Sequence, residues 1–188
     1  LGGVLVDNTQ LEDLPKLVPE PLSAGDLHAL WLSSPAVQQF ERGQIDGITF
    51  STQFVAEWNL ALTPSGFLER VAAWPKGFYP GAADLLTQLR PKHEIAYLSN
   101  SNTVHWAGFS TILLHADRAF ASHICGLVKP DPAIFKLVIS ELGRRPDEIC
   151  FFDDSASNVQ AARIAGMDAH LTKGFSELMA KLEVLGLI

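Results

Sequence analysis

Residues 149–154 read ICFFDD, and this stretch determines the fold class expected for the chain. Its apolar run is followed directly by two carboxylates, Asp153 and Asp154. A short apolar run that ends in polar residues is typical of a strand buried on both faces. Similar runs lie at residues 95–98, 119–121 and 169–171. The sequence therefore predicts several short, buried strands.

Helical patterns separate these apolar runs. A helix is predicted over residues 82–90, before the run at 95–98. Asp131 and Pro132 suit the start of another helix, and Gly143 suits its C-terminal end. Short apolar runs that alternate with helices are typical of a parallel, doubly wound sheet. The predicted fold class is therefore α/β, with a Rossmann-like doubly wound parallel sheet.

Residues 9–78 have a different pattern. Apolar residues recur there near the helical period, and no segment is clearly a strand. Residues 2–6, in contrast, resemble the end of a strand and its turn. We expect an α/β core made of residues 1–8 and 79–188, with a helical cap of residues 9–78 inserted into it.

Composition excludes several classes of partner. The chain has 188 residues, 47% of them hydrophobic, and a net charge of −7, so we expect no general affinity for nucleic acid or anionic membrane. No stretch approaches the roughly 18 apolar residues of a membrane span. Cys125 and Cys150 are interpreted as small buried hydrophobes, which fits a reducing compartment. We expect a cytoplasmic protein that is a monomer or a homodimer.

Polar clusters follow the predicted strands: Gly2-Gly3, Ser99-Asn100 and Asp153-Asp154. In doubly wound sheets the functional site lies beyond the carboxyl ends of the strands. Adjacent carboxylates at such an edge repel each other, and a hard cation such as Mg²⁺ relieves that repulsion. The alternative is an ordinary turn in which an aspartate caps the next helix.

Four further side chains are candidates for binding a phosphate. Lys129 precedes two prolines that stiffen its backbone, although a lone lysine is more often a solvated surface charge. Ser99 and Asn100 offer groups that suit phosphate oxygens, but they also occur in ordinary turns. His105 follows Ser99 by six positions and either faces the same cleft or is a packing residue.

Together these clusters resemble the haloacid dehalogenase superfamily of phosphohydrolases, whose pattern has four motifs in a fixed order. Leu98-Ser99-Asn100 matches the second motif, Lys129 with its prolines the third, and Asp153-Asp154 the fourth. The run at residues 158–163 strengthens the match, and the resemblance covers essentially the whole chain.

The first seven residues match the rest of the first motif, Asp-Leu-Gly-Gly-Val-Leu-Val-Asp. This register places the expected nucleophilic aspartate immediately before Leu1. Gly2 stands where the family pattern usually has a second aspartate, the general acid/base. The resemblance implies that the Gly2 carbonyl ligates Mg²⁺. It leaves Asp7, His105, a metal-bound water or a good leaving group to replace the missing acid.

The form Asp-Leu-Gly, with Ser-Asn-x-x-x-x-His at residues 99–105, is similar to sugar-phosphate phosphatases of the α-glucose-1-phosphate type. The resemblance implies Mg²⁺-dependent hydrolysis of a small phosphoester, a sugar phosphate, through an aspartyl-phosphate. It implies catalytic roles for Ser99, Lys129 and Asp154. The implied substrate contacts are Ser99, Asn100, Lys129 and His105, and the implied metal ligands are Gly2, Asp153 and Asp154.

Two other functions stay open at this point. A haloacid dehalogenase uses the same attacking aspartate on carbon without a metal, and the Asp153-Asp154 pair argues against it because such a pair is costly without a cation. A catalytically impaired relative would bind a phosphorylated ligand without turning it over. Gly2 supports that second alternative.

Overall fold

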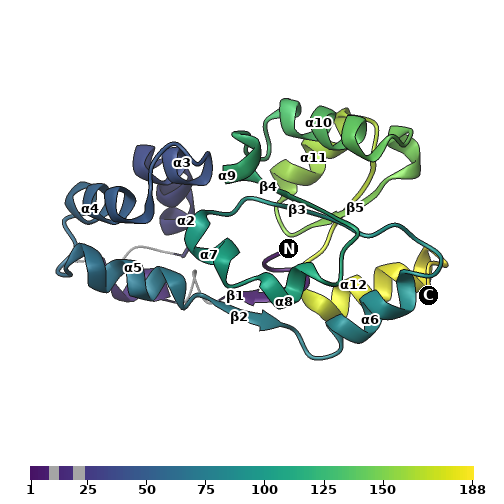
Figure 1. The fold of residues 1–188 in the computed structure, drawn as a ribbon, viewed down its shortest axis with the longest axis horizontal. Helices are drawn as coiled ribbons and strands as arrows, with labels where there is room; N and C mark the ends of the chain where they lie inside the picture. The colour runs from purple at the N-terminus through teal and green to yellow at the C-terminus, as the bar shows by residue number, and fades with distance from the viewer. Residues whose placement is uncertain (9–12, 19–23) are drawn as a thin grey trace.

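The computed structural model describes residues 1–8, 13–18 and 24–188 (Figure 1). Its strands are β1 (Val6–Asn8), β2 (Pro75–Phe78), β3 (Ala96–Ser99), β4 (Arg118–Ala121), β5 (Cys150–Asp153) and β6 (Asp168–Leu171). Its helices are η1 (Leu14–Lys16), α2 (Ala24–Ser33), α3 (Pro35–Glu41), α4 (Gly47–Glu57), α5 (Pro64–Ala72), α6 (Ala82–Leu89), α7 (Thr103–Ala107), α8 (Ser110–Leu113), α9 (Ser122–Cys125), α10 (Pro132–Leu142), η2 (Pro146–Glu148), α11 (Ala156–Ile164) and α12 (Gly174–Val184).

Two parallel strand pairs form the centre of the core. β3 pairs with β4 so that Ser99 lies opposite Ala121, and β5 pairs with β6 so that Asp153 lies opposite Leu171. The predicted α/β class with parallel strands is thus confirmed. Because parallel strands run in one direction, the polar residues that end β3 and β5 are brought to the same edge of the core.

Helices cover both faces of these strands, as expected for a doubly wound arrangement (Figure 1). Apolar residues of α10 and α11, including Ile134 and Val159, pack with Leu98 and Ala169 of the strands. A second cluster joins α6 and α12 to Phe152 of β5. Within the described ranges, no helix is both long and apolar enough to cross a membrane.

The segment between β1 and β2 is mainly helical, as predicted. Helices α2 to α5 enclose an aromatic cluster of their own, with buried rings from Trp31, Phe40, Phe50, Phe54, Phe67 and Trp74. Phe40 stacks on Phe50 with ring centroids 4.3 Å apart. The predicted cap begins at residue 9, and residues 9–12 and 19–23 fall outside the described part of the chain.

The strand signals near the chain start were predicted only in part. Residues 2–6, expected to be the end of a strand and its turn, form a turn with one bridge between Gly2 and Val6, and strand β1 begins at Val6. No clear strand was expected within residues 9–78, yet Pro75–Phe78 forms β2, antiparallel to β1. Pro and Gly are disfavoured in strands, so this segment carries no local strand signal and acquires its structure from pairing with β1.

Candidate active site

Asp153 lies at the carboxyl end of β5 and is only 3% exposed. Its Oδ2 accepts a hydrogen bond from Lys129 Nζ at 2.6 Å. Its Oδ1 accepts bonds from the Ser155 backbone N–H at 3.0 Å and from Asn158 Nδ2 at 2.8 Å. A carboxylate accepts about four hydrogen bonds or ligands, so one acceptor position stays available for a further contact.

Lys129 is buried as well, in contrast to the surface charge that a lone lysine would suggest. Its Nζ donates to the Leu98 carbonyl at 3.0 Å as well as to Asp153, and lies 5.6 Å from the centre of the Phe151 ring. These contacts fix the ammonium at the strand edge. A fixed positive charge at that edge suits an anionic ligand.

The two aspartates differ in electrostatic environment. Burial alone would raise the pKa of Asp153, but the charge and hydrogen bond of Lys129, the charge at the Leu1 nitrogen and the hydrogen bond from Asn158 together hold that pKa below its ordinary value. Partial loss of hydration, together with the negative charge of Asp153, raises the pKa of Asp154. Asp153 thus has an ion-pair partner, whereas Asp154 has none among the described residues and the nearby positive charges do not outweigh its burial.

Gly3 allows Asp154 to approach the N-terminal turn. It adopts φ +72°, and a Cβ placed on it would overlap the carboxylate of Asp154. Only glycine tolerates both this backbone conformation and this close approach. The turn after Leu1 and the acidic pair after β5 are therefore held against each other.

The carbonyl of Gly2 faces no protein donor among the described residues. The carbonyls of Leu1 and Gly3 accept hydrogen bonds from Val6 and Gly174, respectively, but that of Gly2 accepts none. The backbone nitrogen of Leu1 experiences the charges of Lys129, Asp153 and Asp154. The N-terminal turn therefore adjoins the cluster around Lys129, as the motif order led us to expect.

Ser99 and Asn100 are brought to the same edge, but their environments differ. Ser99 is buried at the end of β3, with only a long 3.2 Å contact from its hydroxyl to the Asn100 carbonyl. The Asn100 side chain makes two hydrogen bonds to the backbone of Lys129. The Asn100 Oδ1 accepts from the Lys129 N–H at 2.8 Å, and the Asn100 Nδ2 donates to the Lys129 carbonyl at 2.9 Å. Asn100 thus positions Lys129.

His105 lies away from this cluster. Its Nε2 is 2.7 Å from the carbonyl of Val71 in α5, and its Nδ1 is 3.3 Å from Asn102 Nδ2. These partners indicate the tautomer with a proton on Nε2, and burial lowers the pKa of the ring. The imidazole links α7 to helix α5 of the other helical cluster, and its expected contact with a substrate stays a prediction.

Two residues that shape the site were noted in the sequence only as parts of motifs, without a role of their own. Asn158, in the run at residues 158–163, binds Asp153 from the first turn of α11. Gly3, in the Gly2-Gly3 cluster, makes room for Asp154. The sequence does not show that this glycine is required by a close approach of a side chain from β5.

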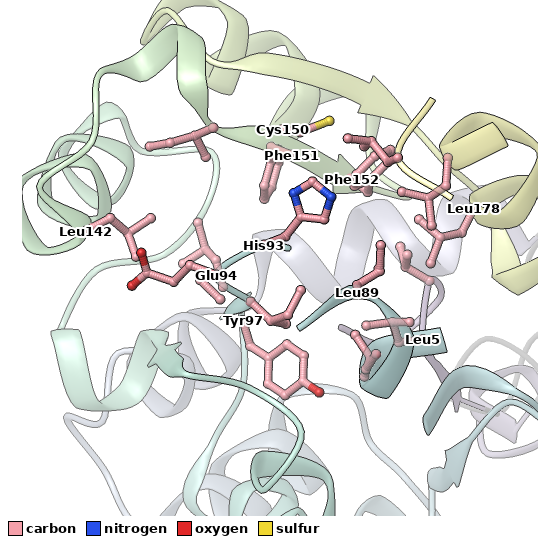
Figure 2. A pocket seen from close by; sticks show the side chains of 18 of the residues that line it. Leu5, Leu89, His93, Glu94, Tyr97, Leu142, Cys150, Phe151, Phe152 and Leu178 are labelled. Atoms are coloured by element: carbon pink, nitrogen blue, oxygen red, sulfur yellow. The ribbon is translucent and has the colours of Figure 1, made fainter. Parts of the chain in front are cut away.

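A large apolar cavity runs between β3 and β5 (Figure 2). It measures about 500 Å³, and its lining includes Leu1, Tyr97, Phe151 and Leu178. None of the predicted site residues lines it. Among the described strands, β3 pairs only with β4 and β5 pairs only with β6. The edges of β3 and β5 that flank the cavity are therefore unpaired within the described residues.

The oxygen atoms at the strand edge fit a hard divalent cation. Among the residues that the structure describes, Asp154 has no ion-pair partner and the Gly2 carbonyl has no protein donor, while Asp153 retains an acceptor position. Oxygen donors of this kind suit Mg²⁺, which keeps several waters and uses one or two carboxylates. The donor set contains no soft ligand that would favour zinc or copper.

Comparisons with known proteins give one family model and several relatives. A sequence profile described as haloacid dehalogenase-like hydrolase matches residues 31–166. D-ribitol-5-phosphate phosphatase of Bacteroides thetaiotaomicron is 25% identical over 98% of this chain and 94% of its own length. Bifunctional epoxide hydrolase 2 of Rattus norvegicus is 36% identical over 69 residues, and the match spans 37% of this chain but only 12% of that protein.

A solved structure has the same fold. It is a haloacid dehalogenase family enzyme of Bacteroides thetaiotaomicron, an Asp-to-Ala mutant in complex with magnesium and inorganic phosphate. The match has a TM-score of 0.76 at 23% identity and covers 92% of this chain and 91% of that one.

Proposed function

This chain belongs to the haloacid dehalogenase-like hydrolase family, and we propose that it is a Mg²⁺-dependent phosphatase of a small sugar phosphate. The observation that carries the proposal is the contrast, beside a buried Lys129, between an ion-paired Asp153 and an Asp154 that has no ion-pair partner among the described residues. A phosphatase relative and a neighbour with bound magnesium and phosphate support it.

Each residue has a distinct role in the proposed reaction. Lys129 binds a phosphoryl oxygen electrostatically, and Ser99 donates a hydrogen bond to another. Asn100 acts through Lys129 by fixing its backbone. Asp154, Asp153 and the Gly2 carbonyl would hold Mg²⁺, which when bound neutralises charge on the phosphoryl group.

We assign the nucleophile to an aspartate immediately before Leu1. Its carboxylate would attack phosphorus while the bond to the leaving-group oxygen breaks, and water would then hydrolyse the aspartyl-phosphate. The proximity of the Leu1 nitrogen to Lys129 and the acidic pair supports this assignment. A carboxylate one residue earlier would lie within the same cluster.

The apolar cavity supports the same assignment. Leu1 lines the cavity together with residues of β3 and β5, such as Tyr97 and Phe151 (Figure 2), and each of these strands is paired on one edge only. A strand leading into Leu1 would pair with both edges and bury its apolar side chains there. Such a strand would run parallel to β3 and β5 and deliver its last residue to the edge that carries Ser99 and Asp153.

We further propose that residues 9–78 act as a cap over a core of residues 1–8 and 79–188. The separate aromatic cluster of α2 to α5 supports an independent unit, and the His105–Val71 contact joins it to the core. A cap excludes water and selects among small substrates. A small sugar phosphate suits such an enclosed site better than a protein substrate does.

A haloacid dehalogenase remains the competing proposal. Its reaction proceeds without a metal, and the charge of Asp154 beside the nucleophile would then repel both the nucleophile and a 2-haloacid anion. Lys129 forms its ion pair with Asp153, and its charge offsets only part of the rise in the pKa of Asp154. The charge of Asp154 therefore favours the phosphatase.

The test is phosphate release by the protein expressed from its complete reading frame, with and without Mg²⁺, across a panel of sugar phosphates. We expect Mg²⁺-dependent turnover that Asp154→Asn abolishes. Asp147→Asn is the matched control, because Asp147 is exposed in η2 at the opposite end of β5. Chloride release from 2-haloacids in EDTA would instead establish the dehalogenase. Phosphate binding without turnover would indicate an impaired relative.

A further inference from the structure

Three side chains that can bind a metal lie on one face of the β5–β6 pair. Alternate residues of a strand share a face, so Asp168 and His170 point to the same side of β6. The parallel register sets Cys150 beside Asp168 and Phe152 beside His170, which adds the Cys150 side chain to that face. The Cys150 sulfur, an Asp168 carboxylate oxygen and a His170 ring nitrogen all lie within 4.8 Å of one another. The strand pairing itself therefore gathers three different ligand types.

The Nε2 atom of His170 is buried without a hydrogen bond to any residue that the structure describes. It lies 3.0 Å from Asp168 Oδ1, but not in the geometry of a hydrogen bond. Stacking on Phe152 holds the ring, with centroids 5.4 Å apart and an interplanar angle of 25°. A buried nitrogen without a partner costs free energy. A cation bound by both the nitrogen and the carboxylate would supply the missing partner.

The mixture of sulfur, nitrogen and oxygen donors indicates which cation fits. Mg²⁺ and Ca²⁺ are bound by oxygen. Zn²⁺ instead accepts Cys, His and Asp together, in tetrahedral sites with bonds of about 2.0–2.3 Å. Ligand atoms around such an ion lie about 3.3–3.6 Å apart. Rotation of the three side chains would bring their present spread of up to 4.8 Å to that separation.

The charges around the cluster also favour a cation. Burial and the charge of Asp168 raise the pKa of the Cys150 thiol to about 12, so the sulfur keeps its proton when no cation is near. A metal ion that binds a thiol removes this proton. Within the described residues, Asp168 has no lysine or arginine as an ion-pair partner, and its side chain is 56% exposed. An ion can therefore reach the cluster from solvent.

We propose that Cys150, Asp168 and His170 form a second metal site, which takes Zn²⁺ and is separate from the Mg²⁺ site. Asp153 follows Cys150 by an odd number of positions, so its side chain points to the other face of the strand. On binding, the Cys150 sulfur releases its proton to solvent, and the ion ties β6 to β5. With three ligands from the chain, a water completes the tetrahedron. This site requires no phosphatase activity and stands independently of the proposed function.

Metal titration tests the site in the protein from its complete reading frame. Excess Mg²⁺ occupies the oxygen site, and a phosphine reductant keeps the thiol reduced without competing for the ion. We expect one Zn²⁺ per chain, and Co²⁺ in its place should give the absorption band of a cobalt–thiolate bond. Cys150→Ser should abolish that band. Cys150→Ser and His170→Gln should each weaken Zn²⁺ binding by more than about a hundredfold, beyond the cost of losing an outer-shell partner.

Cys125→Ser is the matched control. Cys125 is also a free, half-buried cysteine, but it lies in α9 and belongs to no such ligand group among the described residues. Its loss should leave Zn²⁺ affinity and the cobalt band unchanged. Thermal unfolding in EDTA excludes global misfolding of each variant. Asp168→Asn, at a more exposed position, should also weaken Zn²⁺ binding and tests the site without a buried substitution.

Two results would overturn the second metal site. One is a wild-type protein that binds no Zn²⁺ or gives no cobalt–thiolate band. The other is Zn²⁺ binding that survives Cys150→Ser, Asp168→Asn and His170→Gln, which would place the ion elsewhere on the molecule. Loss of phosphatase activity alone bears on neither result, since both are read from metal binding.

Discussion

Lys129 and Asp153 form a buried ion pair, with Nζ 2.6 Å from Oδ2 and side chains only 5% and 4% exposed. The residues are 24 positions apart in sequence and come from the segment before α10 and the end of β5. Two charges removed from water in this way depend on each other. The pair is therefore a structural element as well as part of the candidate site.

Removing one partner of this pair should destabilise the fold. Lys129→Met leaves the Asp153 carboxylate buried without a cation, and we expect the free energy of unfolding to fall by about 3–5 kcal/mol. The double variant Lys129→Met/Asp153→Asn should lose less, because no unpaired charge remains. Urea denaturation measures both. Arg145→Met, in an exposed pair with Asp147, should cost about 0–1 kcal/mol. A Lys129→Met loss as small as that of Arg145→Met would contradict the prediction.

Asp154 should control the response to Mg²⁺. In the wild type, Mg²⁺ at roughly 100 times its Kd should stabilise the fold by about 2.7 kcal/mol. Asp154→Asn should abolish most of this gain without lowering stability in EDTA, because it removes a charge that repels Asp153. Thermal unfolding with and without Mg²⁺ checks both. An unchanged Mg²⁺ response in the variant would exclude Asp154 as a ligand.

Gly43→Ala should weaken the contact between α3 and α9. Its positive φ alone should cost about 1–3 kcal/mol in an alanine, and the new Cβ would also displace the His123 carbonyl. Gly143→Ala is the control for the first effect, since Gly143 has φ +61° with open space around it. We expect Gly43→Ala to be the more destabilising in urea denaturation. Equal losses would mean that the close approach is unimportant.

His105 should make stability fall in mildly acidic solution. Burial lowers the pKa of the folded imidazole below its ordinary 6.5, so the folded state binds fewer protons than the unfolded state. The stability it contributes is present above pH 6.5 and is lost as the pH falls through the folded pKa. Relative to His105→Gln, the wild type should lose free energy of unfolding between pH 7.5 and about pH 5. A parallel pH profile for the two proteins would argue against a buried neutral ring.

Glu41 should change the pH dependence of stability in the direction opposite to that of His105. Its pKa rises from 4.5 to about 7 on folding, so the folded state binds more protons than the unfolded state. Its contribution is fully present below pH 4.5 and is lost as the pH rises through 7. Relative to Glu41→Gln, the wild type should become less stable between these values, as measured by urea denaturation. The opposing charges of Lys129 and Arg42 are unchanged in both proteins, so the difference reports Glu41.

Much of the core could be predicted because its signals are local. The apolar run before Asp153 predicted β5, and Asp131, Pro132 and Gly143 predicted both ends of α10. The carboxyl ends of parallel strands meet at one edge, so Ser99 and Asp153 could be assigned to a common site from sequence alone. Strand β2 could not be predicted from sequence, because Pro75 and Gly77 disfavour a strand and the segment becomes one only by pairing with β1.

The sequence by itself determined the fold class and the types of residue at the strand ends, since periodicity and turn chemistry are encoded in neighbouring positions. Tertiary structure alone decided which side chains meet. Asn100 binds the backbone of Lys129, His105 reaches Val71, and Lys129 pairs with Asp153. The physical reason is that such contacts depend on how whole helices pack, and burial then sets the protonation that a carboxyl or an imidazole adopts.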